Sequence, residues 1–287
     1  MAATLLGREA SELLGVRVGV SINRCDIKSD DMENLANQID RKALLKIKFP
    51  KVFQGFGKLK GYQLKLHIDE NVQPVAQPVR GIPFSRWAKV TEKLEELLKP
   101  DVIGKVEGPK RWVNALVVVE KPNGDIRICL DMRQAIYAIV REKHPVETLQ
   151  EVSYANVFSK LDLNMAFHQI KLHPDSSDIT TFAAPDGLCR YKGLLFGVNL
   201  ATEKFQQIVW QVIKGCQSAH SLHDDLRVLG ADDKEHDENL DRVMRKLKEC
   251  GLTLNYDKCA LILVAWFTWV MYSLVKDWKS PVNEGKL

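Results

Sequence analysis

Apolar residues recur at helical spacing in three segments of the chain, which we therefore predict to be amphipathic helices. They span residues 87–99, 199–214 and 233–250. Within the last segment, Leu240 and Val243 fall on one face of the expected helix. Each segment is followed by a residue that commonly terminates helices, and these residues are Pro100, Gly215 and Gly251.

Other segments are rich in β-branched residues and predict strands. Residues 113–121 and 126–130 flank an Asn-Gly pair, which is the strongest short-range signal for a β-hairpin. Further strands are predicted at 157–163 and 252–255, whereas the proline-rich residues 72–83 should be extended. Helices and strands follow no regular βαβ rhythm, so we expect an α+β fold with helices on one face of a sheet.

Composition and charge narrow the picture only slightly. The 287 residues are 45% hydrophobic and 27% charged, with a net charge of +4, which is typical of a globular protein. One stretch is basic, between Arg41 and Lys65. It could follow a phosphate backbone or form a solvated face, and charge alone does not decide between them. Its other lysines are Lys42, Lys46, Lys48, Lys51, Lys58 and Lys60.

Cysteine spacing and hydropathy exclude several classes of protein. The six cysteines are scattered without a CxxC pair, which argues against a disulfide scaffold or zinc ribbon and fits a reducing compartment. The first residues lack the features of a signal peptide. The uncharged run 260–275 is shorter than the roughly 20 residues of a membrane span, and its composition favours buried strands. We therefore expect no membrane partner, and the sequence does not distinguish a cytoplasmic from a nuclear location.

Carboxylates occur at two places in apolar, strand-like surroundings. Asp162 lies inside the segment FSKLDL, and the pair Asp224-Asp225 lies inside LHDDL. Adjacent carboxylates repel one another unless a cation neutralises them. An acid pair in a tight hairpin, with a third acid on a neighbouring strand, could hold Mg²⁺, which prefers oxygen ligands. Two such ions roughly 4 Å apart can activate a primer hydroxyl and stabilise the leaving pyrophosphate.

The residues around these acids resemble motifs of the reverse transcriptases of gypsy-type long-terminal-repeat retrotransposons. Residues 158–164, followed by 167–170, are similar to the first catalytic motif of that family. The resemblance extends from Phe49 to Cys259. The other matching motifs, in order, are 127–135 (fingers to palm), 196–199 with 205–206 (nucleotide-pocket turn and helix), 223–225 with 230 and 235–240 (catalytic hairpin and next helix), and 251–255 with 258–259 (the strand beyond).

The resemblance implies a right-hand polymerase architecture, in which an antiparallel palm sheet is backed by helices. It implies fingers and palm with the thumb missing or present only as a stub. The expected divisions are 1–45 as a protease-tail remnant and connector, 46–137 as N-terminal extension and fingers, 138–170 as the first part of the palm, 171–200 as the second part of the fingers, 201–273 as the rest of the palm with the primer grip, and 274–287 as the start of a thumb.

The resemblance also assigns roles to individual residues. Asp162, Asp224 and Asp225 would be catalytic and would hold Mg²⁺ or Mn²⁺. Phe167 would be an aromatic steric gate that excludes a ribose 2′-hydroxyl, although a core aromatic is the alternative. The other expected nucleotide-binding residues are Lys121 and Arg127 on the arms of the Asn-Gly hairpin, and Gln169, Phe196 and Gly197 in the nucleotide pocket; for Lys121 and Arg127 the alternative is a surface charge.

The resemblance implies an RNA-directed DNA polymerase, a nucleotidyltransferase that adds deoxynucleoside triphosphates to a DNA primer on an RNA template. Residues 5–15 look like the last segment of an aspartic protease, but no Asp-Thr-Gly occurs in the chain, so protease activity is not expected. The expected truncation of the thumb would weaken duplex binding. A dimer, or other segments of the same polyprotein, would be further partners.

Several residues depart from the family pattern. Leu222 stands two places before the acid pair, and Arg227 falls in the strand that follows. An arginine in a buried strand is costly unless it is paired, whereas an outward-facing arginine would be harmless. Trp269 replaces a usual glycine, and residues 146–156 form a short connection. Ile136-Tyr137 replaces a polar pair.

The sequence leaves two alternatives to the polymerase, an inactive module and a zinc site. The departures favour a catalytically inactive remnant kept as a nucleic-acid-binding or interaction module, whereas the three aspartates favour the polymerase. A zinc site built from Cys216, His220 and His223 is less favoured, because the His220–His223 spacing on a strand directs the two rings to opposite faces.

Overall fold

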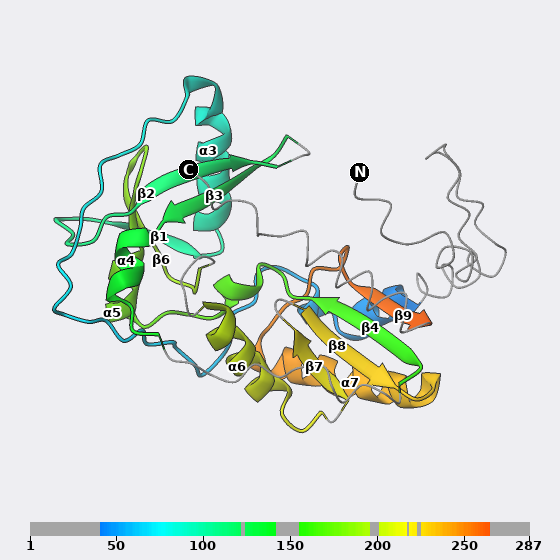
Figure 1. Cartoon of the computed structure of the whole chain (residues 1–287). Helices are drawn as coiled ribbons and strands as arrows, with labels where there is room; N and C mark the ends of the chain where they lie inside the picture. Colours follow the sequence, from blue (N-terminus) through cyan, green and yellow to red (C-terminus); the bar gives the residue numbers. More distant parts are fainter. Residues whose placement is uncertain are drawn as a thin grey trace, which may run out of the picture. The chain divides into compact units, whose positions relative to one another are not determined.

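Most of the chain after its first forty residues is well described. The computed structural model describes residues 41–121, 124–141, 155–195, 201–216, 218–222 and 225–264 (Figure 1). The expected protease tail, most of the short connection 146–156, Phe196, Gly197, His223, Asp224 and Trp269 lie outside these residues. One apolar core cluster includes residues from both the predicted palm and the predicted fingers, such as Leu161 and Phe182.

A four-stranded antiparallel sheet forms the predicted palm. Its strand order is β7 (Ala219–Leu222), β8 (Asp225–Gly230), β4 (Val157–Asp162) and β9 (Ala260–Val264). The predicted strand at 157–163 is therefore confirmed within one residue. The start of the apolar run 260–275 forms strand β9, as expected for buried strands, and the rest of that run lies outside the described residues.

Two helices back this sheet, as the sequence predicted (Figure 1). Helix α7 (Asp233–Cys250) packs on β8 and β4, and helix α6 (Ala201–Ile213) packs on β7 and α7. Gly230 allows the start of α7 to lie close to the sheet, since a Cβ there would lie 2.5 Å from the backbone nitrogen of His236. Within the described ranges, no helix is long and apolar enough to cross a membrane.

The ends of α7 follow from local sequence. The Asp232 carboxylate accepts a hydrogen bond of 2.8 Å from the backbone N–H of Glu235, and the Glu235 carboxylate accepts one of 3.0 Å from Ala231 N–H. These two bonds satisfy amide groups that have no partner within the helix. Gly251 ends the helix in a left-handed conformation with φ of 79°, as predicted.

The predicted fingers contain the expected hairpin and a second small sheet. Strands β2 (Ala115–Glu120) and β3 (Ile126–Asp131) pair in antiparallel register on either side of the Asn-Gly turn. The second sheet has the order β1-β6-β5. The bounds of these three strands and of the fingers helices are β1 Ile103–Val106, β5 Thr181–Ala184, β6 Gly187–Tyr191, α3 Phe84–Leu98 and α4 Arg133–Ala138.

Short helical segments connect these parts. Residues 41–48 are helical. Residues 72–83 contain no helix, as expected of the proline-rich stretch. The remaining short elements are η1 Pro50–Val52, η2 Ala166–Gln169, α5 Pro174–Ser177 and η3 Asp178–Thr180.

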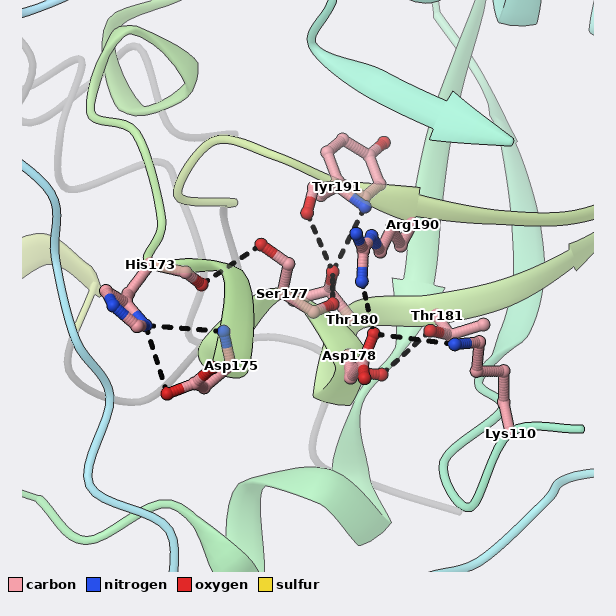
Figure 2. A network of polar contacts seen from close by, with 9 residues as sticks. All are labelled: Lys110, His173, Asp175, Ser177, Asp178, Thr180, Thr181, Arg190 and Tyr191. Atoms are coloured by element: carbon pink, nitrogen blue, oxygen red, sulfur yellow. Dashed lines mark hydrogen bonds and ion pairs between the residues drawn. The ribbon is translucent and has the colours of Figure 1, made fainter. Parts of the chain in front are cut away.

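A polar network fixes the connection from α5 to β6 (Figure 2). The Thr180 hydroxyl donates to the carbonyl of Ser177 at 2.6 Å and accepts from the backbone N–H of Tyr191 at 3.0 Å. The Asp178 carboxylate pairs with Arg190, and Lys110 Nζ lies 3.9 Å from it (Figure 2). Since Thr180 is fully buried, its hydroxyl replaces backbone partners that the turn cannot supply.

The predicted strand at 252–255 is wrong. Only Leu254 makes a bridge, to Leu163. The backbone of Thr253 instead bonds to a side chain: its N–H donates to Gln169 Oε1 at 2.8 Å, and its carbonyl accepts from Gln169 Nε2 at 2.9 Å. A side-chain amide therefore takes the place of a neighbouring strand, which no local pattern in the sequence reveals.

Candidate active site

The two described acids of the predicted catalytic triad face each other across the palm sheet. In the register of β4 and β8, Asp162 lies directly opposite Asp225. Residues in such a pair have Cβ atoms about 4.5–5.5 Å apart. The sheet geometry therefore brings together two carboxylates that are 63 positions apart in the sequence.

Both acids project from the face of the sheet that α7 leaves uncovered. Side chains alternate along a strand, and Gly230 marks the face that contacts α7. Asp225 lies five residues before Gly230 and thus belongs to the opposite face. The side chains of Asp162 and Asp225 are 18% and 21% exposed, so a ligand from solution can reach them.

The same face carries two cationic side chains, each two residues away from one of the acids on the same strand. Lys160 lies opposite Arg227 in the register that pairs Asp162 with Asp225. Arg227 is 3% exposed, so the alternative of an outward-facing arginine is wrong. The pleat therefore arranges two acids and two bases as neighbouring pairs on one surface.

Lysines contact both carboxylates. Lys160 Nζ lies 2.6 Å from Asp225 Oδ2, and Lys258 Nζ lies 3.8 Å from Asp162 Oδ1. Burial raises the pKa of Asp162 above its ordinary value; the Asp225 carboxylate acts in the same direction, and the two lysines oppose it. The positive charge around Asp162 therefore does not fully compensate for its burial.

The β7–β8 hairpin holds the third predicted acid. Leu222 pairs with Asp225, so only His223 and Asp224 connect the two strands. Two-residue connections are the tightest common hairpin loops. Asp224 directly precedes Asp225 in the sequence and lies outside the described residues.

The carboxylate oxygens of Asp162 and Asp225 are suitable ligands for a hard divalent cation. Carboxylate oxygens are the ligands that Mg²⁺ and Mn²⁺ prefer, and Mg²⁺ usually takes only one or two carboxylates from the protein. No group of three His, Cys, Asp or Glu side chains that could hold a metal occurs within the residues described above. Asp162 and Asp225 are two of the three acids expected to hold the metal, and Asp224, the third, lies outside the described residues.

The backbone of Asp162 is held by the segment that follows α7. Its carbonyl accepts a hydrogen bond of 2.8 Å from Asn255 N–H, and Cys259 Sγ lies 3.4 Å from its amide nitrogen. Burial raises the pKa of Cys259 to about 11, so the thiol stays neutral. This contact is structural, and it carries Lys258 to the neighbourhood of Asp162.

Gln169, a predicted nucleotide-binding residue, is buried and has its side chain turned into the protein. Its amide group contacts Thr253 as described above, and Nε2 also donates to the carbonyl of Asn164 at 2.6 Å. Gly57 packs against this amide, since a Cβ there would lie 2.2 Å from Gln169 Oε1. The geometry gives Gln169 the role of positioning the loop after Asp162.

Phe167, the predicted steric gate, lies in η2 next to this loop. It is 7% exposed, and its ring centroid lies 4.8 Å from that of Phe205 on α6. Both of its predicted roles remain compatible with this position, because a mostly buried ring can still present an edge to a neighbouring ligand. Phe196 and Gly197, predicted to line the same pocket, lie outside the described residues.

The two predicted fingers cations occupy the hairpin. Lys121 sits at its tip, where its Nζ lies 2.5 Å from Asp125 Oδ2. Arg127 is exposed on β3, opposite Val119. The structure does not bring either residue together with the palm carboxylates. A triphosphate that recruited Lys121 would have to compete with Asp125.

Much of the basic stretch between residues 41 and 65 is engaged within the protein. Lys42 and Lys46 place their Nζ atoms 4.5 and 4.4 Å from the ring centroid of Tyr256. Lys48 pairs with Asp241 at 2.5 Å, and Lys58 pairs with Asp101 at 3.1 Å. These contacts anchor the stretch to the palm and fingers.

Sequence reasoning missed the lysines of the site. Lys160 lies two residues before Asp162, and that spacing alone places both on one face of a strand. Lys258 gives no such signal, because a turn rather than a strand brings it to Asp162. Of the alternative zinc site, Cys216 is buried and His220 lies on β7 opposite Arg227, while His223 is outside the described residues.

Known proteins are similar to this chain in sequence and in fold. A family model described as reverse transcriptase (RNA-dependent DNA polymerase) matches residues 119–283. The retrovirus-related Pol polyprotein from transposon 412 of Drosophila melanogaster is 30% identical over 213 residues, which are 70% of this chain and 17% of the relative. The uncharacterized protein K02A2.6 of Caenorhabditis elegans is 26% identical over 278 residues, which are 89% of this chain and 22% of the relative.

Solved structures extend the likeness to the fold. The native prototype foamy virus protease-reverse transcriptase superposes with a TM-score of 0.70 at 20% identity, over 79% of this chain and 31% of that one. The foamy viral protein in complex with an RNA/DNA hybrid gives a TM-score of 0.67 at 20% identity, over 84% and 32%. This likeness confirms the predicted right-hand polymerase fold with fingers and palm.

The chain spans about a fifth of the length of the curated relatives and about a third of these solved chains. The transposon polyprotein among the relatives agrees with the gypsy-type resemblance of the motifs. The match of the family model covers more than half of the chain and includes both described acids. The chain therefore belongs to the reverse transcriptase (RNA-dependent DNA polymerase) family.

Proposed function

We propose that this chain is the fingers-and-palm core of an RNA-directed DNA polymerase, which transfers deoxynucleotides to a primer 3′-hydroxyl. The observation that carries the proposal is the register that sets Asp162 opposite Asp225 on the face of the palm sheet that points away from α7. The proposal keeps the divisions expected from the sequence, with the N-terminal extension and fingers in 46–137, further fingers in 171–200, and the palm in 138–170 and, with the primer grip, in 201–273.

Asp162, Asp224 and Asp225 would hold two divalent cations, Mg²⁺ or Mn²⁺. When bound, such ions lower the pKa of the attacking hydroxyl and neutralise the leaving pyrophosphate. The chain's own contribution is positional. Asn255 holds the backbone carbonyl of Asp162 and Gln169 holds that of Asn164, two residues later, so that the Asp162 carboxylate keeps one orientation toward Asp225.

Other residues would select and hold the nucleotide. Phe167 would exclude a ribose 2′-hydroxyl by shape. Lys121 and Arg127 would contact the triphosphate, with Phe196 and Gly197 beside the base or sugar. A foamy viral relative has been solved with an RNA/DNA hybrid, and for this chain we propose the same class of duplex, bound mainly through its backbone and shape.

Primer extension on an RNA template with Mg²⁺ or Mn²⁺ tests the proposal. The matched control replaces both hairpin acids, Asp224→Asn with Asp225→Asn, which removes charge at almost constant volume. Extension by the natural chain that the double variant abolishes supports the polymerase. Failure of the folded natural chain to extend any primer contradicts it.

A second candidate is a catalytically inactive module that retains the fold. It is favoured by one observation, the burial of Arg227 on the same face as the two acids. If Arg227 blocks the site, Arg227→Leu should create extension activity that the natural chain lacks. If the natural chain is already active, this candidate is excluded.

A further inference from the structure

One close ionic contact of the candidate active site is made by a residue without an assigned role. Lys160 Nζ lies 2.6 Å from Asp225 Oδ2, and both side chains are largely shielded, with 29% and 21% exposure. Ion pairs at this distance attract more strongly when water is partly excluded. The Lys160 ammonium therefore contacts Asp225 Oδ2, one of the two oxygens with which Asp225 could bind a metal ion.

Sheet geometry makes this contact a built feature rather than a chance meeting of surface charges. Lys160 and Asp162 are two residues apart on β4, so they share a face, and β8 sets Asp225 opposite Asp162. Lys160 therefore reaches Asp225 diagonally across the two strands. Diagonal neighbours are within reach of long side chains.

The charges of this face explain why such a contact is useful. Two carboxylates in directly opposed positions repel each other, and the partial burial of both side chains reduces the screening of that repulsion by water. One ammonium beside Asp225 removes part of that repulsion. A divalent cation that uses the same oxygen would do so more strongly, and it would meet the ammonium as a competitor.

We propose that Lys160 is an internal counter-ion of the candidate catalytic carboxylates and sets their affinity for divalent cations. The proposal rests on the proposed role of Asp162 and Asp225 as metal ligands. Lys160 is thereby a positioning residue: it holds the Asp225 carboxylate until a cation of higher charge displaces the ammonium. The long lysine side chain can withdraw without any movement of the strands.

Lys258 offers an internal comparison. Its Nζ lies 3.8 Å from Asp162 Oδ1, and its side chain is 67% exposed. Solvent screens such a pair, and exposed pairs contribute little. Removal of Lys258 should therefore change cation affinity much less than removal of Lys160.

Titration of the full chain with Mn²⁺, followed by the electron paramagnetic resonance signal of the free ion, tests the proposal. Lys160→Met should bind Mn²⁺ about three- to tenfold more tightly than the natural chain, because the competing ammonium is gone. Lys160→Arg, which keeps the charge, should stay within about twofold of the natural chain on the same grounds. Lys258→Met should give a change below about twofold.

Lys93→Met is the matched control for net charge. Lys93 pairs with Glu96 at 2.6 Å and is 28% exposed, which nearly reproduces the distance and exposure of Lys160, but it lies on α3. Its removal should leave Mn²⁺ affinity unchanged. An increase equal to that of Lys160→Met would overturn the proposal in favour of a general charge effect.

A second readout covers the case in which Lys160→Met weakens the fold. The Mn²⁺-dependent rise in melting temperature should be larger for this variant than for the natural chain, since tighter binding stabilises the folded state more. Equal or weaker binding by Lys160→Met, while Asp225→Asn abolishes binding, would overturn the proposal and leave the metal site intact. Absence of Mn²⁺ binding in every variant would overturn the metal site itself, and this proposal with it.

Discussion

Two aspartates of this protein, both largely shielded from solvent, have pKa values that are shifted in opposite directions. Asp131, at the end of β3, is 9% exposed, and the Arg133 guanidinium, assisted by Arg80, lowers its pKa to about 2. Asp162, at the end of β4, is also largely shielded, but burial raises its pKa. Charged partners overcome the cost of burial in the fingers but not in the palm.

The geometry of the partners accounts for this difference. Arg133 donates two hydrogen bonds to Asp131, from Nε at 2.8 Å and from a terminal nitrogen at 2.7 Å. A bidentate guanidinium matches both carboxylate oxygens. Asp162 has the ammonium of Lys258 at 3.8 Å and the more distant charge of Lys160, and its opposite neighbour is a second acid.

This contrast separates a carboxylate whose charge the protein itself neutralises from one that we propose to be a metal ligand. Asp131 is saturated by the protein itself and joins the hairpin to α4, whereas Asp162 retains capacity for another cation. Perturbed pKa values point to functional sites only when a specific arrangement of charges supports them. The register of Asp162 with Asp225 supplies that arrangement here.

The largest expected effect comes from replacing Asp162, the palm member of this pair of aspartates. Asp162→Asn should reduce primer extension by roughly a thousandfold, because a metal ligand contributes several kcal/mol to the transition state. The variant should remain as stable as the natural chain or become slightly more stable, since it removes an undercompensated charge. Extension rates and urea unfolding measured on the same preparation check both parts.

A loss of stability with unchanged extension would assign Asp162 the structural role instead. The same pair of measurements on Asp131→Asn provides the mirror image, in which stability falls and the intrinsic chemistry per folded molecule is retained. Both substitutions keep the side-chain volume and remove one charge. Only the surroundings of the two acids differ.

The next effect concerns the scaffold behind Asp162. Gly57→Ala should lower the free energy of unfolding by about 3 kcal/mol, because the added methyl group meets Gln169 and backbone atoms and cannot be accommodated without shifts. Gly81→Ala is the matched control, since no atom lies within 4 Å of the added Cβ. Urea unfolding of both variants measures the difference. Equal stability of the two would mean that the Gln169 amide is not held tightly.

Sequence patterns predicted the local elements of both regions well. The Asn-Gly turn gave the β2–β3 hairpin, and the periodicity of 233–250 with Gly251 gave α7 at its observed bounds. These features depend on residues close together in the chain. The acidic segments also indicated a cation site, since carboxylates in apolar strands need neutralisation.

Long-range side-chain contacts could not be predicted in the same way. The segment 252–255 has the composition of a strand, but Gln169 occupies the hydrogen bonds that a neighbouring strand would use. Lys258 reaches Asp162 only because a turn places it there. Arg227 could have faced either way, because a single charged residue in a strand does not reveal the register.

A smaller effect is expected from replacing Asp131, the fingers member of the pair of aspartates. Asp131→Asn should lower the free energy of unfolding at neutral pH by about 1–2 kcal/mol, because a folded pKa near 2 lies well below the unfolded value and the partners are partly solvated. For a depressed pKa, this stabilisation is present above about pH 4 and is lost as the pH falls toward 2.

Urea unfolding as a function of pH measures this contribution. The natural chain should lose stability over that acidic range by more than the Asp131→Asn variant does. Parallel curves for the two proteins would show that Asp131 contributes nothing through its charge.

The smallest effect divides the stabilisation of Asp131 between its two arginines. Arg133 forms the bidentate contact, whereas Arg80 reaches one oxygen, Oδ2. Arg133→Gln should therefore raise the acid midpoint of the Asp131 carboxyl, followed by its carbon chemical shift, more than Arg80→Gln does. Each substitution should cost less stability than Asp131→Asn, since the Arg133 side chain is largely exposed and that of Arg80 about half exposed. A larger shift from Arg80→Gln would mean that the less exposed Arg80 guanidinium outweighs the two hydrogen bonds from Arg133. The difference between Asp131 and Asp162 would then depend on shielding from solvent and not on bidentate geometry.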